Sequence, residues 1–438
     1  MPTSSIHQRA SGLPAVQPSA HRIPLVVLSH LRWGFVFQRP QHLLSRLAQQ
    51  FDVYFVEEPV FRDGAPALQA RRQPGGVEVI TPETPVHSPG FHDDQMPALK
   101  SLLADFMVER GIVEPLVWLY TPMALPLVAD LEPRAVVYDC MDDLASFKFA
   151  PPQLLEREHA LMALADVVLT GGPSLYEARK HLHPNIHCLP SAVDTAHFAP
   201  ANLDPNAAES RLAADLHEAM PHPRLGFFGV IDERIDLDLV AQLADQRPGW
   251  HIVMAGPVVK IDASALPQRP NLHWIGMQRY ETLPHLMAHW DVCLLPFALN
   301  EHTRFISPTK TLEYLAGGKP AVSTPIRDVV SLYGPVVRIG ATADEFVAAI
   351  EQTLAQPAQE RDAWRVAAQA TVDSCTWDNT AARIAQLLGA YARSSAARSI
   401  VMDGRRAAAR SHGEDAHATD SLPLLTDRVD LGVQPLSL

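Results

Sequence analysis

The sequence has few cysteines, fewer basic than acidic residues and no long apolar run. Its four cysteines form no Cys-X-X-Cys pair, which argues against a structural zinc site or a disulfide framework and fits a reducing compartment. No apolar stretch approaches the roughly 18 residues of a membrane-spanning helix. Lys and Arg total 36 against 49 Asp and Glu, a formal net charge of -13. The chain therefore lacks the overall field that drives binding to nucleic acid or anionic lipid.

Aromatic residues are also scarce, at 7%, although hydrophobic residues make up 47% of the 438 positions. This balance favours α/β layers over an aromatic-rich β protein, and the length suffices for two such domains. The histidines are scattered, and the pair His285 and His289 lacks the Glu of a zinc-protease helix, so we expect no metal. The polar N-terminus has no apolar core of a signal peptide. We expect a disordered leader over residues 1–22 and a cytoplasmic protein.

Short apolar runs alternate with helical patterns, as in parallel βαβ units. In the first half the expected strands are Pro24–Ser29, Asp52–Val56, Val77–Ile80, Leu116–Tyr120, Ala135–Asp139, Asp166–Thr170 and Ile186–Leu189. In the second half they are Arg224–Phe228, His251–Ala255, Leu272–Ile275, Val292–Pro296, Ala321–Ser323 and Val336–Ile339. We predict a Rossmann-like domain over residues 23–190, a linker over 191–222, a second such domain with three closing helices over 223–393, and a mobile tail over 394–438.

Two glycines follow strands of the second domain. Gly229 comes after Arg224–Phe228, and Gly256 ends the next strand. Glycine at such a place lets backbone approach a ligand, and open α/β sheets bind ligands at the carboxyl ends of their strands. A tight turn with no ligand is the alternative for each.

The segment Ser307–Pro320 (SPTKTLEYLAGGKP) predicts a helix with Ser307 as N-cap and a stop at the two glycines. Lys310 falls in the first turn, where a cation opposes the helix dipole unless an anion binds there. Glu313 lies three residues on, on the same face, and its carboxylate suits a ribose. The alternative is a surface Lys–Glu pair on an ordinary helix.

Four segments carry a resemblance to a known family. The stretch Pro308–Val322 resembles the donor-site segment of GT-B-fold glycosyltransferases of the family-4 type. Leu189–Phe198 (LPSAVDTAHF) resembles the exit from their N-terminal domain. Phe37–Leu43 (FQRPQHL) and Tyr138–Asp143 (YDCMDD) are similar to a subgroup that includes the teichuronic-acid biosynthesis glycosyltransferases. The match runs from Pro24 to Leu388, so it implies the GT-B fold: two doubly wound domains facing a cleft.

The resemblance implies that Glu313 is the second Glu of the family's E-X7-E pair and binds ribose. The first Glu falls at Phe305, so the sequence departs from the pattern there; Asn300 or Glu301 are candidates to substitute. After Gly229 only Arg234 offers a positive charge, so Lys310 must supply most of the charge facing the diphosphate. The predicted donor site is Gly229, Arg234, Gly256, Thr309, Lys310 and Glu313.

The acceptor is expected at the first domain. Three carboxylates follow the strand Ala135–Asp139, and such groups can orient a sugar hydroxyl or act as a base; an acidic capping loop is the alternative. The loop after the first strand mixes aromatic and polar groups, with Trp33 and Phe35 able to stack on sugars, although Arg39 also suits a structural salt bridge. Our acceptor-side residues are Gln38, Arg39, His42, Asp139 and Asp143, and our catalytic residues are Lys310 and Asp142.

The expected function is transfer of a sugar from a nucleoside-diphosphate sugar to a hydroxyl of a saccharide or lipid-linked acceptor. The resemblance implies retention at the anomeric carbon and a role in surface or exported polysaccharide synthesis, with no metal cofactor needed. A lipid-linked acceptor would bring peripheral contact with the inner membrane face. The alternatives are a nucleotide-sugar 2-epimerase, a phosphorylase, or a sugar-binding scaffold without catalysis.

Overall fold

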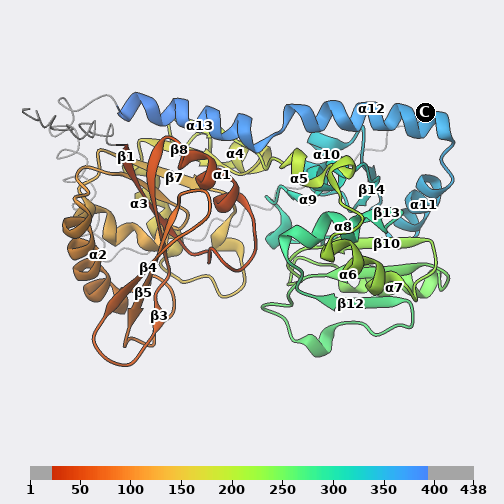
Figure 1. Cartoon of the computed structure of the whole chain (residues 1–438), viewed down its shortest axis with the longest axis horizontal. Helices are drawn as coiled ribbons and strands as arrows, with labels where there is room; N and C mark the ends of the chain where they lie inside the picture. Colours follow the sequence, from red (N-terminus) through yellow and green to blue (C-terminus); the bar gives the residue numbers. More distant parts are fainter. Residues whose placement is uncertain (1–21, 393–438) are drawn as a thin grey trace, which may run out of the picture. The chain divides into compact units, whose positions relative to one another are not determined.

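The computed structural model describes residues 22–392, which contain one β-sheet in each half of the chain (Figure 1). The predicted leader up to residue 21 and the predicted tail lie outside the described residues. Within residues 22–392, no helix is both long and apolar enough to cross a bilayer.

The first sheet has nine strands in the described part of the chain. They are β1 (Ile23–Ser29), β2 (Phe51–Glu57), β3 (Val60–Phe61), β4 (Ala67–Arg72), β5 (Glu78–Thr84), β6 (Leu116–Leu119), β7 (Ala135–Cys140), β8 (Val167–Thr170) and β9 (Ile186–Cys188). Their order is β3-β5-β2-β1-β6-β7-β8-β9, and all pair in parallel except β4, which joins β5 antiparallel. The chain winds in opposite directions on the two sides of β1, which makes the sheet doubly wound.

The second sheet has six strands among the described residues, all parallel. They are β10 (Arg224–Phe228), β11 (His251–Ala255), β12 (Leu272–Gly276), β13 (Val292–Leu295), β14 (Ala321–Ser323) and β15 (Arg338–Ile339). The order β12-β11-β10-β13-β14-β15 is again doubly wound. The prediction of two Rossmann-like domains is confirmed.

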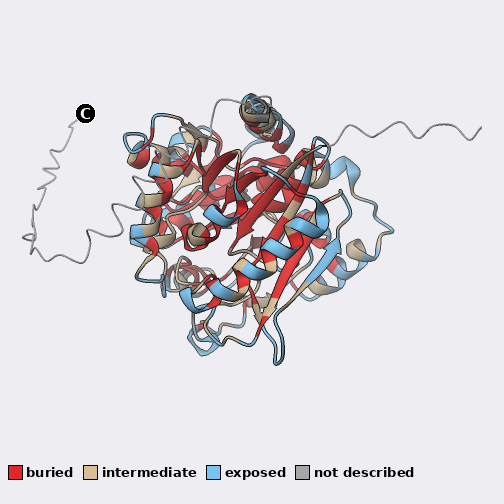
Figure 2. Ribbon diagram, turned by 90° about the vertical axis from the view of Figure 1, so that its left-hand side faces the viewer, coloured by how far each residue is buried: buried red, intermediate tan, exposed pale blue. Residues whose placement is uncertain are grey.

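Helices cover the sheets. They are α1 (Arg39–Leu47), α2 (Met96–Arg110), α3 (Leu154–Leu164), α4 (Pro173–Arg179), α5 (Thr195–Phe198), α6 (Ala208–His217), α7 (Leu237–Gln246), α8 (Leu283–Ala288), α9 (Lys310–Ala316), α10 (Arg327–Tyr333), α11 (Ala343–Leu354), α12 (Ala358–Ser374) and α13 (Trp377–Ala392). Strands buried on both faces read as continuous apolar runs. Figure 2 shows this arrangement, with buried strands and helices whose outer faces are exposed.

The last helix, α13, packs with the first domain, although we placed residues 223–393 in the second. Trp377, Ile384 and Leu388 are buried in one cluster with Leu25 and Trp118 of the first sheet. The preceding helix, α12, contributes Ala368 and Val372 to the core of the second domain (not the first). The chain therefore crosses back between α12 and α13, and both helices run along one side of the molecule in Figure 1.

The predicted linker over residues 191–222 is more ordered than we expected. It contains α5 and α6, and Phe198 and Ala213 are buried in the core of the second domain. Asp194 caps α5 by accepting the backbone N–H of His197 at 3.2 Å. We missed α6, of which only Ala213 and His217 are buried, because so small a buried face gives little helical periodicity.

Candidate active site

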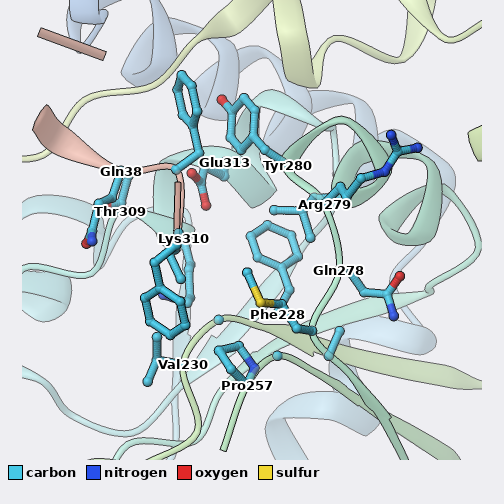
Figure 3. Close-up of a pocket in the computed structure, with 18 of the residues that line it drawn as sticks. Gln38, Phe228, Val230, Pro257, Gln278, Arg279, Tyr280, Thr309, Lys310 and Glu313 are labelled. Atoms are coloured by element: carbon cyan, nitrogen blue, oxygen red, sulfur yellow. The ribbon is translucent and has the colours of Figure 1, made fainter. Parts of the chain in front are cut away.

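A cavity of about 320 Å³ lies between the two domains, a size that suits a small molecule (Figure 3). The first domain contributes the loop Trp33–Gln38, which follows β1. The second domain contributes the residues after β10, β11 and β12 and the start of α9, which include Phe228, Gly229, Val230, Gly256, Pro257, Met277, Gln278, Arg279, Tyr280, Thr309, Lys310 and Glu313. The cavity therefore sits at the carboxyl ends of the central strands, as expected for an open α/β sheet.

The two predicted glycine turns form one wall of this cavity. Gly229 has φ of 139° and Gly256 has φ of 155°, values that other residues rarely adopt. A Cβ at Gly256 would lie 1.8 Å from the carbonyl oxygen of Gly229. A side chain at Gly256 would therefore push the two turns apart, and one at Gly229 would displace Lys310.

Lys310 lies across the first of these turns. A Cβ at Gly229 would fall 1.9 Å from Lys310 Cε, and Lys310 Nζ lies 5.8 Å from the centroid of the Phe227 ring. Burial lowers the pKa of Lys310, and the nearby cation Arg234 acts in the same direction, whereas Glu313 opposes both. Asp232 and Asp142 also raise this pKa, but burial is the largest cause, and a buried ammonium favours an anionic ligand.

Glu313 also belongs to the cavity wall, and it is 7% exposed. Burial raises its pKa to about 7, although Lys310 draws it down. In Figure 3, Glu313 lies between Lys310 and Thr309 on one side and Gln278 and Arg279 on the other. The structure thus brings together five of the six predicted donor residues: Gly229, Gly256, Thr309, Lys310 and Glu313.

The helix that carries Lys310 starts later than we predicted. Its N-cap is Thr309 rather than Ser307, and the Thr309 side chain makes no capping hydrogen bond. Instead the carbonyl of Ser307 accepts a hydrogen bond from Ser191 Oγ at 3.1 Å, and Thr309 Oγ1 donates to the same Ser191 oxygen at 3.1 Å. These contacts with the segment that leaves the first domain hold Ser307 out of the helix.

The sequence did not point to the apolar side of the cavity. Phe37 and Tyr280 stack with ring centroids 4.4 Å apart, and both line the cavity. Tyr280 also stacks on His197 at 4.0 Å. The sequence could have predicted this side, because Met277–Tyr280 follows the carboxyl end of β12 in the same way as Gly229 and Gly256 follow β10 and β11.

Arg234, the sixth predicted donor residue, has another partner. Its guanidinium contacts both carboxylate oxygens of Asp232, with Nη2 at 2.7 Å from Oδ2 and Nε at 2.9 Å from Oδ1. It also lies 5.4 Å from the ring centroid of Phe147, in the first domain. Arg234 is not among the residues that line the cavity. We therefore correct its assignment from donor contact to a contact between the domains.

Asp142, our candidate base, lies in the loop after β7. Burial raises its pKa to about 6, while Arg234 and Arg39 lower it. It is one of the groups that influence the pKa of Lys310, so it lies near that side of the cavity without lining it. Its catalytic role stays a prediction.

Three of the predicted acceptor-side residues are buried against protein partners in this structure, and their role with an acceptor stays a prediction. Arg39 and Asp139 are 4% and 0% exposed and form an ion pair, with Arg39 Nε 2.9 Å from Asp139 Oδ2. Arg39 also donates to the carbonyl of Leu189 at 2.9 Å. His42 is 2% exposed and stacks on Trp377, with ring centroids 4.9 Å apart. His42 also lies 5.5 Å from the ring centroid of Tyr280, a cavity residue of the second domain.

The other two acceptor-side residues differ from each other. Asp143 pairs with Arg179, its Oδ1 2.7 Å from Nη2, and Arg179 also pairs with Glu158 at 3.2 Å. The carboxylate of Asp143 is therefore already paired with a residue of the first domain. Gln38 does line the cavity, and its role with the acceptor stays a prediction.

Phe305, at the position of the family's first Glu, faces the first domain. Its ring packs against the core of that domain, and the guanidinium carbon of Arg179 lies 6.0 Å from its centroid. Asn300 and Glu301 are both exposed, and Asn300 caps a short 3-10 helix. None of these three residues lines the cavity. In the described part of the chain, no three His, Cys, Asp or Glu residues are grouped to hold a metal ion.

Two Rossmann-like domains with a cavity between them define the GT-B class of glycosyltransferase folds. Solved structures agree. Sucrose-phosphate synthase (tll1590) from Thermosynechococcus elongatus matches with a TM-score of 0.66 at 15% identity, covering 85% of this chain and 100% of that one. HepE (Alr3699) of Anabaena, solved with UDP-glucose, matches with a TM-score of 0.62 at 13% identity, covering 84% and 100%. At these identities the likeness shows the fold alone.

Residues 222–356, in the second domain, match the family model described as "Glycosyl transferases group 1". The chain is also 26% identical over 261 residues to the "Putative teichuronic acid biosynthesis glycosyltransferase TuaH" of Bacillus subtilis (strain 168). That match covers 55% of this chain and 64% of the relative, which is less than two thirds of the relative's length. The predicted resemblance to this subgroup is confirmed.

Proposed function

We propose that this protein transfers a sugar from a nucleoside-diphosphate sugar to a hydroxyl of a saccharide or lipid-linked acceptor. One observation carries the proposal: Lys310 and Glu313 share the wall of a cavity whose other wall is two glycine turns. The segment lies inside the part of the chain that matches the group 1 glycosyltransferase family. A structural neighbour solved with UDP-glucose supports a uridine nucleotide as the first donor to test.

In this proposal the diphosphate binds at Gly229 and Lys310, and the ribose hydroxyls donate to Glu313. Negative charge grows on the diphosphate as the bond to the sugar breaks. The buried ammonium of Lys310 therefore stabilises the transition state more than the bound donor. Because Lys310 supplies this charge, the proposal needs no metal.

We further propose retention at the anomeric carbon and a role in surface polysaccharide synthesis, as the likeness to TuaH suggests. The acceptor enters from the first-domain side, past Gln38 and the loop Trp33–Gln38. In this proposal the carboxylate of Asp142 orients the acceptor hydroxyl.

The test is direct titration followed by turnover. Calorimetry with UDP and GDP, then with UDP-glucose, UDP-N-acetylglucosamine and GDP-mannose, is expected to give a dissociation constant between about 1 μM and 1 mM for one nucleotide series. Chromatography should then detect slow release of the free nucleoside diphosphate from the preferred donor. A chain that binds none of these nucleotides does not have the proposed function.

A sugar-binding protein without catalysis is the second candidate, and one observation favours it. Phe305 packs on the first domain and offers no polar group to the transferred sugar. This candidate requires donor binding without any release of nucleoside diphosphate, so the same chromatography separates the two.

The pH dependence of donor binding tests Glu313. Its pKa of about 7 lies above the usual range, so the carboxylate gains its charge only as the pH rises through neutrality. Because the charged form accepts the ribose hydroxyls, the affinity for UDP-glucose should fall about tenfold from about pH 8 to about pH 6. UDP-glucose itself has no group that titrates in this interval.

The Glu313→Gln variant is the control for this measurement. It should bind UDP-glucose more weakly and with little pH dependence, since Gln carries no titrating group. The same pH profile in both proteins would show that Glu313 is not the group responsible.

A further inference from the structure

Glu233 lies in the loop after Gly229 and has no described hydrogen-bond partner. Its side chain is 11% exposed, and both carboxylate oxygens are buried without a hydrogen bond. The nearest cation is Lys260, whose Nζ is 3.7 Å from Oε1, beyond hydrogen-bond distance. A buried carboxylate in this state costs free energy unless another group completes its hydrogen bonds.

Lys260 has an unusual backbone conformation and an aromatic contact with the other domain. Its φ is 61°, a value rare for lysine, and its ammonium lies 4.9 Å from the ring centroid of Phe147, across the domain boundary. Strain of this kind concentrates at functional sites. Phe147 thus covers both Lys260 and Arg234, whose guanidinium lies 5.4 Å from the same ring.

A third group with unused hydrogen-bonding capacity comes from the first domain. His30 follows β1, and its Nδ1 is buried without a hydrogen-bond partner. Lys260 is close enough to lower the pKa of His30, although burial is the larger cause. Glu233 and Lys260 therefore lie together and His30 is near Lys260, although none of the three lines the cavity itself.

This region adjoins the cavity. The loop after Gly229 and the loop after Gly256 run side by side, with Ile231 N–H donating to Pro257 O at 2.9 Å and Val259 N–H donating to Ile231 O at 3.0 Å. Val230 and Pro257, at the start of these loops, line the cavity below Lys310 in Figure 3. Glu233 and Lys260 are three residues further along each loop than Val230 and Pro257.

We propose that Glu233 accepts hydrogen bonds from hydroxyls of the transferred sugar, with Lys260 and His30 completing the subsite. The proposal rests on the function proposed above. A sugar ring is the ligand class that fits, because each hydroxyl both donates and accepts, as this mixed set of partners requires. The bound nucleotide places the sugar beyond its diphosphate, which is where these loops lead.

The experiment compares nucleotide with nucleotide sugar. The wild type and Glu233→Gln are titrated with UDP and with UDP-glucose, or with GDP and GDP-mannose if the wild type prefers guanosine. Glu233→Gln should leave the nucleotide affinity unchanged and weaken the nucleotide-sugar affinity about tenfold, because a charged acceptor is replaced by a weaker neutral one. Donor hydrolysis should fall with it.

Thermal unfolding separates this role from a structural one. Removing an unpaired buried charge should leave Tm unchanged or raise it, as is common at functional sites. If Glu233 serves only to pair with Lys260, Tm falls and the ratio of the two affinities stays at the wild-type value, which overturns the proposal. The exposed Glu218, in the same domain, provides the control variant Glu218→Gln, which should change neither measurement.

Different experimental outcomes overturn the proposed function and this inference. A wild-type protein that binds no nucleotide overturns the proposed function and this inference together. Normal nucleotide binding with an unchanged ratio in Glu233→Gln overturns this inference alone.

Discussion

The Lys310→Ala variant is expected to lose about 10²- to 10³-fold in kcat for donor hydrolysis and transfer, with a smaller loss in donor affinity. The ammonium lies over the Gly229 turn, so its removal leaves the developing charge of the diphosphate without a facing cation. Steady-state kinetics with the preferred donor, on protein whose Tm is known, measures the effect.

The fold should tolerate this change. Burial lowers the pKa of Lys310, so keeping its ammonium charged without a bound anion destabilises the folded protein. Replacing Lys310 by Ala should therefore not lower Tm appreciably. The exposed Lys100 pairs with Asp130 on the surface of the first domain, and Lys100→Ala is the matched control, with wild-type kinetics expected. Full activity in Lys310→Ala would refute the assignment of the donor site.

The second large effect concerns stability. Arg39→Met should lower the free energy of unfolding by about 3–5 kcal/mol, because Asp139 is left as a buried, unpaired charge. Denaturant unfolding measures this difference. The folded fraction should still bind nucleotide normally, since neither residue lines the cavity.

Two comparisons sharpen this test. The double variant Arg39→Met with Asp139→Leu removes both charges and should recover much of the lost stability. Arg62→Met breaks an exposed pair with Glu83 and should cost less than about 1 kcal/mol. If Arg39→Met unfolds like Arg62→Met and fails only in transfer, then Arg39 contacts the acceptor after all, as the sequence first suggested.

Apolar periodicity predicted the strands that form the centre of each sheet. β3 and β4 were missed because they lie at an edge: Ala67–Arg72 (ALQARR) is mostly exposed, so it has no apolar run to mark it. Its pairing with β5 comes from backbone hydrogen bonds, which composition does not report. The same cause hid α6, whose buried face is small.

The structure brings together those predicted site residues whose position after a strand determines where they lie. Gly229 and Gly256 were found because glycine after a parallel strand has a local meaning. Arg39 and Asp139 fit an acceptor site by residue type, but the sequence could not show that they pair with each other, because they lie 100 positions apart. The sequence could not single out Glu233, because a Glu in a loop is expected to be exposed. Its burial depends on the other domain, whose Phe147 lies over the neighbouring Arg234 and Lys260.

The return of α13 to the first domain affects how the chain folds during synthesis. The groove that receives Trp377 and Leu388 is built from residues of the first sheet, such as Trp118. These residues are synthesised well before α13, so the groove forms early on the ribosome. At about 5–20 residues per second, the helix that fills it emerges roughly 10–40 s after residue 190. During that interval the nascent first domain exposes an apolar groove, which makes it a natural client for a ribosome-associated chaperone. A gene split between the domains would leave that groove open unless both fragments were expressed together.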